Sequence, residues 1–238
     1  MPNSQKPARK TAFNSRAPKR LAILAKTSEA PKSRIWERNE ATILSGAERV
    51  FARAGFEGAT MAQIAEEAGV PKPNLHYYFG NKLDLYRAVL NRVLHDWLDP
   101  TDVIVAEAEP RIALENYVRK KMALAFARPD ASRVFANELL HGAPVIGELL
   151  RGELRATVRE KAAVIDGWIE AGKMAAVDST HLFFTLWAAT QTYADFDVQI
   201  RAVIGSDTQK TSAQRRATEH VLKVVLRTCG LEDGAAVR

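Results

Sequence analysis

Four polar side chains within the six positions 72–77 have the clearest capacity for molecular recognition in this sequence: Lys72, Asn74, His76 and Tyr77. In the major groove of DNA, amide and imidazole groups read base edges, while ammonium and phenol groups bind the phosphate backbone. Leu75, Tyr78 and Phe79 lie among them at helical spacing and would form the buried face. The pattern indicates a short helix that presents a hydrogen-bonding, cationic surface.

A helix, a tight turn and a second helix would position these side chains within residues 60–82, TMAQIAEEAGVPKPNLHYYFGNK. Thr60 and Gln63 form a capping-box pair that starts the first helix. Gly69 supplies the left-handed residue that ends it. Pro71 can begin the second helix, because a proline at the first helical position loses no hydrogen bond. Many such corners bind nothing, so this outline alone leaves DNA binding and a plain helical corner about equally open.

The identities of the residues in this segment are more informative than the helix-turn-helix pattern alone. It resembles the N-terminal DNA-binding domain of the TetR family of transcriptional regulators at Thr60, Ile64, Ala65, Gly69, Val70, Lys72, Asn74, Leu75, Tyr77, Phe79, Lys82, Leu85 and Tyr86. The resemblance implies an all-helical homodimer whose third helix enters the major groove of a double-stranded operator. It also implies a C-terminal domain that binds a small molecule and thereby alters operator affinity. Pro71 departs from the pattern, because these regulators usually carry a capping Ser or Thr there, and Pro73 stands where a small residue is common.

The predicted DNA contacts combine this resemblance with helix chemistry. Lys82 would lie in the first turn of a fourth helix capped by Asn81, where an ammonium and a helix N-terminus together favour a phosphate. A two-fold dimer would read a pseudo-palindromic site. The predicted DNA-binding residues are Thr60, Lys72, Asn74, His76, Tyr77 and Lys82.

The composition is ordinary for a soluble protein, with 47% hydrophobic and 26% charged residues in a chain of 238. No apolar run approaches the length that spans a membrane. The single cysteine, Cys229, excludes an intramolecular disulfide and is predicted to be a packing residue. We expect a bacterial cytoplasmic protein associated with the nucleoid, without a membrane partner.

The net charge of +6 is concentrated at the N-terminus. The first 34 residues hold nine Lys and Arg side chains against the single Glu29, a charge of +8, which leaves −2 for the rest of the chain. Residues 1–33 are predicted to be a disordered basic arm. The arm could lie along DNA phosphates or serve only as a solubilising tail, and the sequence favours neither. A cleaved targeting peptide is a third possibility, because the arm is rich in Arg and poor in acidic residues.

The remaining sequence predicts helices throughout, and no strand pattern competes with them. The predicted fold is therefore all-α, with about nine helices, a helix-turn-helix domain at residues 34–80, a ligand-binding and dimerisation domain at 81–231, and a tail at 232–238. The first helix would run from Ile35 to Gly55 and the fourth from Asn81 to Trp97. The later helices are expected at residues 111–126, 130–141, 145–172 with a break near Gly152, 178–204, and 213–229.

The last two predicted helices carry more apolar side chains than one buried face requires. Pairing them across a two-fold axis would give a four-helix dimer interface. They could equally be core helices of a monomer, and the family resemblance favours the dimer.

Three C-terminal stretches, residues 128–144, 166–173 and 187–205, resemble the TetR-family regulators of pyrimidine utilisation, which sense uracil and thymine. This resemblance implies a pocket between the fourth helix and the helix that carries Trp187. The candidate ligand-binding residues are Trp97, Trp187, Gln191, Tyr193 and Asp195.

The chemistry of one pair supports that assignment independently of the resemblance. Trp187 and Gln191 are four residues apart, and therefore neighbours on one helix face. A primary amide matches the alternating carbonyl and N–H edge of a uracil-like ring, and an indole offers a flat wall. A Gln bonded to a helix carbonyl beside a Trp that fills a domain seam would look the same in sequence.

An enzyme is the rival class of function, and none of the common catalytic or nucleotide-binding motifs is present. Glu138 and His141, with Asp195 and Asp197, could imitate a helical carboxylate metal site, but the second Glu-x-x-His pair that such a site needs is missing. The prediction is a repressor that is not an enzyme and needs no cofactor or metal, with uracil or thymine as effector. The alternatives are a related regulator of a different small ligand or a helical metal-dependent enzyme.

Overall fold

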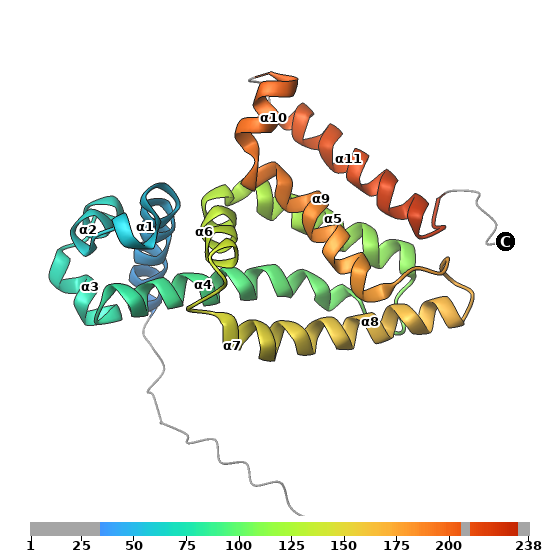
Figure 1. Cartoon of the computed structure of the whole chain (residues 1–238), viewed down its shortest axis with the longest axis horizontal. Coiled ribbons are helices and arrows are strands. Elements are labelled where there is room, and N and C mark those ends of the chain that lie inside the picture. The colour runs from blue at the N-terminus through green and yellow to red at the C-terminus, as the bar shows by residue number, and fades with distance from the viewer. Residues whose placement is uncertain (1–33, 206–209, 233–238) are drawn as a thin grey trace, which may run out of the picture.

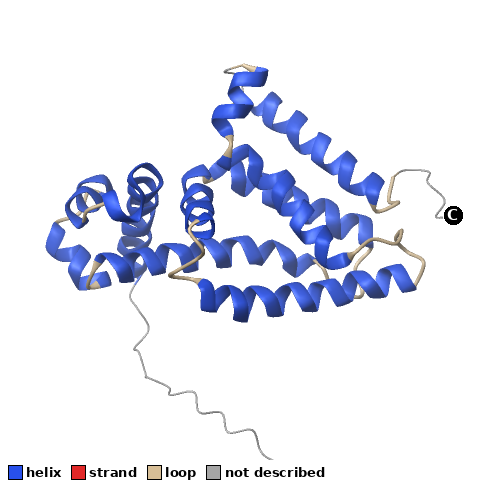
Figure 2. Cartoon of the chain, in the orientation of Figure 1, coloured by secondary structure: helices blue, strands red, loops and turns tan. Residues whose placement is uncertain are grey.

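The computed structural model describes residues 34–205 and 210–232, and their regular structure is entirely helical (Figure 2). This confirms the predicted all-α class. The predicted disordered arm at residues 1–33 lies outside the described residues, as does the tail beyond residue 232.

The helix-turn-helix unit consists of α1 (Arg34–Gly58), α2 (Met61–Ala68) and α3 (Lys72–Phe79) (Figure 1). Thr60 caps α2 through the predicted capping box, in which its hydroxyl accepts from the Gln63 amide and the Gln63 side chain accepts from the Thr60 amide. Gly69 ends α2 in the left-handed region at φ 66°. These local signals are confirmed because they act within a few residues.

The start of α3 differs from the prediction by one position. Pro71 is the residue before the helix, with ψ 137°, and Lys72 is the first helical residue. Pro73 is therefore the second helical residue, and no side chain caps α3. Both prolines fit here because the first amides of a helix have no partner within it, so neither ring removes a helical hydrogen bond.

Helices α1 and α2 approach each other closely at one glycine. A Cβ atom on Gly46 would lie 2.8 Å from the Cβ and 2.9 Å from the Cα of Ala68. The same pair of helices is linked at the surface by Glu67, which accepts from Arg49 at 2.6 Å and also from Arg53. The hydrogen bonds from Arg53 and Arg49 lower the pKa of the Glu67 carboxyl.

Beyond the helix-turn-helix unit, α4 runs from α3 into the body of the molecule (Figure 1). It contacts α1, α6 and η1, whereas α11 packs against α5 and α9. Asn81 caps α4 as predicted. The remaining elements are α4 (Lys82–Leu98), η1 (Asp99–Val103), α5 (Pro110–Ala127), α6 (Pro129–Leu140), α7 (Gly147–Leu149), η2 (Leu150–Leu154), α8 (Arg155–Glu170), α9 (Ser179–Asp195), α10 (Asp197–Ile204) and α11 (Thr211–Thr228).

Two long predicted helices are divided. The break expected near Gly152 is confirmed as the single π-helical turn η2, which separates α7 from α8. The continuous helix expected at residues 178–204 is wrong, because Phe196 interrupts it with ψ 31° and α10 starts in a new direction. The side chain of Phe196 is 57% exposed, so burial of this aromatic ring does not explain why the helix is interrupted here.

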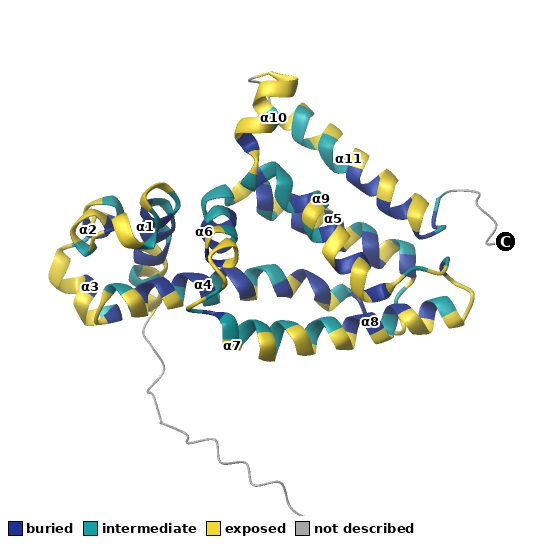
Figure 3. Ribbon diagram, in the orientation of Figure 1, coloured by how far each residue is buried: buried dark blue, intermediate teal, exposed yellow. Residues whose placement is uncertain are grey.

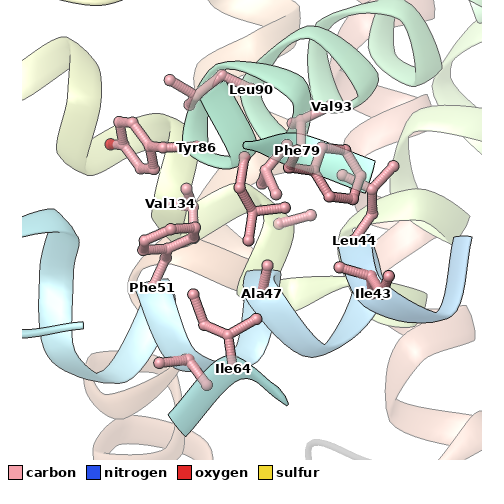
Figure 4. Packing of buried hydrophobic residues seen from close by; sticks show 14 of the residues in the cluster. Ile43, Leu44, Ala47, Phe51, Ile64, Phe79, Tyr86, Leu90, Val93 and Val134 are labelled. Atoms are coloured by element: carbon pink, nitrogen blue, oxygen red, sulfur yellow. The ribbon is translucent and has the colours of Figure 1, made fainter. Parts of the chain in front are cut away.

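The buried residues form two cores. The first joins α1 to α4 with α6, and Figure 4 shows Phe51, Tyr86 and Val134 meeting there. The second joins α5, α8, α9 and α11, and it includes the fully buried Cys229 that the sequence placed as a packing residue. The first core therefore extends past residue 80, because α4 and α6 pack with the helix-turn-helix unit. The domain boundary at that residue stays a prediction.

An ion cluster adds to the contact between α1 and the rest of the molecule. Glu48 of α1 is 5% exposed and accepts from Arg128, which lies between α5 and α6. Arg128 also donates to Asp96 of α4. Burial alone would lower the pKa of Arg128, and the two carboxylates reverse that effect and raise it. Arg92 of α4 lies 4.0 Å from Glu48 and completes the cluster.

The close approach of α1 and α2 generates a prediction about stability. Gly46→Ala should destabilise the protein by about 1–3 kcal/mol, because the added methyl group meets the Ala68 backbone and the helices must separate. Gly167→Ala is the matched control, since Gly167 lies in α8 with nothing within 4 Å of the added Cβ. It should be neutral or stabilise by up to about 1 kcal/mol. Urea unfolding midpoints measure both, and equal midpoints for Gly46→Ala and the wild type would contradict the close packing.

Candidate functional site

The outer face of α3 carries the predicted DNA-reading side chains. Lys72, Asn74, His76 and Tyr77 are all exposed, and Tyr77 is 78% exposed. Figure 3 shows α3 among the most exposed helices of the helix-turn-helix unit. All four side chains are therefore accessible from solvent, and their contacts with DNA stay predictions.

The inner face of α3 is fixed by packing. Leu75 and Phe79 are buried in the first core. Tyr78 lies against Trp36 of α1 with ring centroids 4.9 Å apart, and its hydroxyl accepts from Asn39 at 3.2 Å. The exposed side chains therefore project from a helix whose position is set by α1.

His76 has a defined hydrogen-bonding state. Its Nδ1 lies 2.7 Å from the carbonyl oxygen of Gly80. A carbonyl only accepts, so Nδ1 carries the proton, and in the neutral ring Nε2 is an acceptor. His76 can then accept from an amino group on a base edge, such as N4 of cytosine or N6 of adenine.

Two other predicted DNA-binding residues have structural roles. The Lys82 ammonium donates to three carbonyls at the end of α1, those of Phe56 at 2.8 Å, Ala59 at 3.1 Å and Glu57 at 3.3 Å. It also lies 4.5 Å from the centroid of the Phe56 ring. The Thr60 hydroxyl is engaged in its capping box. Phosphate contacts by Lys82 and Thr60 stay predictions, and both residues hold the helix-turn-helix unit together.

A cavity of about 100 Å³ lies between α4, α5, α6, η2 and α9. It brings together three of the five predicted ligand-binding residues, Trp97, Trp187 and Gln191. The other lining residues are Leu94, Leu98, Lys121, Phe135, Leu139, Leu150 and Leu154. Its wall is thus mostly apolar with few polar groups, as small-molecule sites usually are.

The polar groups of this cavity differ in whether they already form a hydrogen bond within the protein. The indole N–H of Trp187 donates to the Tyr117 hydroxyl at 3.0 Å, so it is already used. The half-buried amide of Gln191 makes no hydrogen bond with any residue that the structure describes. The alternative raised from the sequence, in which the Gln191 amide is hydrogen-bonded to a helix carbonyl, is therefore not found. The amide can donate a hydrogen bond to a ligand and accept one from it.

Lys121 is a cavity residue that the sequence analysis missed. It belongs to α5, is 2% exposed, and places its ammonium 4.4 Å from the centroid of the Trp97 ring. A signal was present, because Lys121 shares the helix face of Leu114, Tyr117 and Val118. A lysine among these apolar positions breaks the amphipathic pattern and marks an unusual site.

Tyr193 and Asp195 are not part of the cavity lining. Tyr193 packs against Phe126, with ring centroids 5.8 Å apart, and lines a separate shallow depression beside α10 and α11. Asp195 accepts from the Ser132 hydroxyl at 2.5 Å. Burial raises the pKa of Asp195, against the opposing effects of that hydrogen bond and of Arg133 and Lys121. Their direct contact with a ligand stays a prediction.

Glu138, which the sequence analysis considered as a ligand of an alternative metal site, binds the backbone of the loop that follows α6. It is 4% exposed and accepts from the amides of Val145 at 2.6 Å and Ile146 at 3.2 Å, and from the Tyr86 hydroxyl at 3.2 Å. His141 is bonded through Nδ1 to the Asn137 carbonyl of its own helix. Both side chains thus stabilise the end of α6.

Comparison with known protein families covers nearly all of the described chain. Residues 43–89 match the family described as "Bacterial regulatory proteins, tetR family". Residues 90–232 match "YcdC-like protein, C-terminal region". The chain belongs to the TetR family of regulators.

Individual TetR relatives agree with this assignment. The chain is 40% identical over 195 residues to the HTH-type transcriptional regulator RutR of Escherichia coli (strain K12), covering 82% of this chain and 92% of RutR. It has the fold of a TetR family transcriptional regulator, PfmR, from Thermus thermophilus, with a TM-score of 0.59, 17% identity, and coverage of 78% and 94%. A TetR-like regulator from Rhodococcus sp. RHA1 gives a TM-score of 0.58, 19% identity, and coverage of 80% and 94%.

The two TetR regions meet within α4, between residues 89 and 90. One helix therefore begins beside α3 and ends near Trp97 in the cavity. Within residues 34–205 and 210–232, no helix is long and apolar enough to cross a membrane.

The carbonyl contacts of Lys82 predict a stability effect that DNA binding alone would not produce. Lys82→Met should lower the free energy of unfolding by about 1–2 kcal/mol, because three carbonyls at the end of α1 lose a charged donor. Lys72→Met is the matched control, since Lys72 is exposed on α3, and it should leave stability unchanged within about 0.5 kcal/mol. Thermal unfolding without DNA measures both variants. If they melt together, the three contacts do not stabilise the fold.

Proposed function

We propose that this protein is a TetR-family repressor that binds a pseudo-palindromic DNA operator as a homodimer and responds to a pyrimidine such as uracil or thymine. The observation that carries the effector proposal is the unengaged amide of Gln191 in an aromatic cavity directly beside α4. The resemblance of residues 128–144, 166–173 and 187–205 to pyrimidine-utilisation regulators, and the similarity to RutR, support the same effector class.

The DNA-binding part of the proposal rests on the exposed face of α3. Asn74 and His76 have side chains that read base edges, and Lys72 and Tyr77 have side chains that bind phosphate. A two-fold dimer presents two copies of α3, so its half-sites would lie about one helical turn, roughly 34–36 Å, apart. The protein would act in the bacterial cytoplasm on nucleoid DNA.

The proposed dimer interface lies on the outer faces of α9 and α11. Phe184 of α9 is 49% exposed and Val224 of α11 is 48% exposed, although each helix also buries an apolar face in the second core. Apolar side chains on two adjacent outer faces favour a four-helix contact between protomers. Light scattering should give the dimer mass at micromolar concentration.

The proposed switch acts through α4. An effector alters operator affinity only if it binds one spacing of the two α3 helices better than the other. Trp97 near the end of α4 lines the cavity, and α6, which contributes Phe135 to the same wall, reaches α1 through the Arg128 cluster. A tilt of α4 could move α3 out of register with the major groove. Coupling of this kind is typically about 1–3 kcal/mol and is reciprocal.

The α3 assignments predict different effects for different side chains. After the operator is selected from randomised duplexes, Asn74→Ala and His76→Ala should each reduce preference for it over random DNA by about tenfold, because a base contact is lost. Lys72→Ala should weaken both complexes alike and reduce the salt slope by about one. Fluorescence anisotropy at several salt concentrations measures these quantities. Equal losses on both DNAs for all three variants would refute the division of roles.

The cavity predicts an effector response that depends on one amide. Uracil or thymine should raise the melting temperature of the wild type, since a ligand that prefers the folded state stabilises it. Gln191→Ala should abolish that rise and the release of DNA while leaving operator affinity without ligand intact. Gln199→Ala, on the exposed side of α10, is the matched amide control and should respond like the wild type. A Gln191→Ala protein that still responds would exclude this site.

A further inference from the structure

A second hollow is separate from the cavity that contains Trp187 and Gln191. It is a groove of about 540 Å³ between the end of α1 and the end of α6, and we call it the α1–α6 groove. None of the described residues lines both hollows. Small-molecule sites typically enclose about 300–1,000 Å³. A molecule in this groove would contact the helix-turn-helix unit and a helix of the C-terminal region at once.

One wall of the α1–α6 groove is aromatic. Phe51 and Phe56 come from α1 and Tyr86 from α4, and each phenylalanine ring lies with its centroid 4.9 Å from that of Tyr86. Phe51 and Tyr86 are buried and Phe56 is half-buried. Figure 4 shows Phe51, Tyr86 and Val134 meeting from three different helices. Aromatic faces carry partial negative charge, so this wall suits an apolar group or a cation.

The opposite wall contains a buried charge without a counter-charge. Glu138 lines the groove and is 4% exposed. Its Oε1 accepts from the amides of Val145 and Ile146, and its Oε2 accepts from the Tyr86 hydroxyl. These donors are all neutral, and Glu138 forms no ion pair with any residue in the described ranges. A buried carboxylate is costly unless a cation pairs with it, so packing within the chain leaves Glu138 uncompensated.

The recorded hydrogen bonds leave Glu138 able to accept another. A carboxylate has about four acceptor sites, and Oε2 has a single donor at 3.2 Å. Burial and the charge of Glu138 raise the pKa of the Tyr86 hydroxyl, which therefore stays a neutral donor. Oε2 can thus accept from a molecule in the groove while it keeps its bond with Tyr86.

The cation recorded beside the aromatic wall does not neutralise Glu138. The Lys82 ammonium lies 4.5 Å from the centroid of the Phe56 ring and donates to three backbone carbonyls at the end of α1. The described lining includes no lysine or arginine, and it includes a second carboxylate, that of the exposed Glu57. The charged side chains that line the groove are therefore acidic.

We propose that the α1–α6 groove is a second ligand site that binds an organic cation, a protonated amine whose ammonium donates to Glu138 while its apolar group lies against the aromatic wall. The site lies outside the cavity proposed for the pyrimidine, and the inference does not depend on that proposal. An ammonium supplies both the missing charge and a donor. A carboxylate ligand would instead place a like charge beside Glu57 and Glu138.

The experiment is calorimetric titration of three probes into the full-length protein at about pH 7, where an alkylamine is protonated. The probes are 2-phenylethylamine, 2-phenylethanol and 3-phenylpropanoate, which share an aromatic group and differ in charge. The amine should bind at least ~10-fold more tightly than the alcohol, because it alone forms the charge-assisted bond with Glu138. The acid should bind most weakly of the three.

Two variants locate the site. Ala54 lines the groove at an exposed position of α1, so Ala54→Trp should fill the groove and abolish binding of the amine. Ala156→Trp, at an exposed position of α8, is the matched control and should bind the amine like the wild type. Glu138→Gln keeps an acceptor for the loop amides without the charge, so it should remove the preference for the amine over the alcohol.

The outcomes are separable from those of the pyrimidine proposal. Equal affinities of the wild type for amine and alcohol, or binding of neither, overturn the cation site. An Ala54→Trp protein that binds the amine like the wild type overturns it as well, and this test holds even if Glu138→Gln does not fold. Gln191→Ala should keep its affinity for the amine, so a protein that ignores uracil and thymine yet binds the amine in this groove loses the pyrimidine proposal alone.

Discussion

The pairing of a buried carboxylate with a distant guanidinium limits how this protein can move. Glu48 lies inside α1, and removing the partner of such a charge typically costs about 3–5 kcal/mol, so Arg128 must stay with it. Arg128 is also bound to Asp96 of α4. Helix α1 is therefore tied both to the junction of α5 and α6 and to α4.

The division of the molecule into two cores does not coincide with the boundary between the two family regions at residues 89 and 90. The core of α1 to α4 also includes α6, so the helix-turn-helix unit packs with a helix from the C-terminal region. The core of α5, α8, α9 and α11 holds the surface proposed for dimerisation. The cavity lies where these two cores meet, with Trp97 and Phe135 from one and Trp187 from the other. A ligand there contacts both bodies at once, which is what a coupling site requires.

The sequence predicted the features that depend on neighbouring residues. The capping box of Thr60 and the turn at Gly69 were readable because their chemistry is complete within one helix end. The sequence could not predict contacts between elements far apart in the chain, such as the carbonyls that hold Lys82 and the aromatic face beneath Lys121. The break at Phe196 was also missed, since neither a Gly nor a Pro marks it in the sequence.

The two prolines at the start of α3 have a consequence for the entropy of folding. Pro71 and Pro73 restrict the backbone of this segment even in the unfolded chain, so less conformational freedom is lost when α3 forms. They also lack amide protons, and the Asn74 amide is already bonded to the Pro71 carbonyl at 2.9 Å. The first turn of α3 therefore has few backbone donors to offer a phosphate. In the proposed complex, the contacts of α3 with the phosphate backbone would therefore come almost wholly from its side chains.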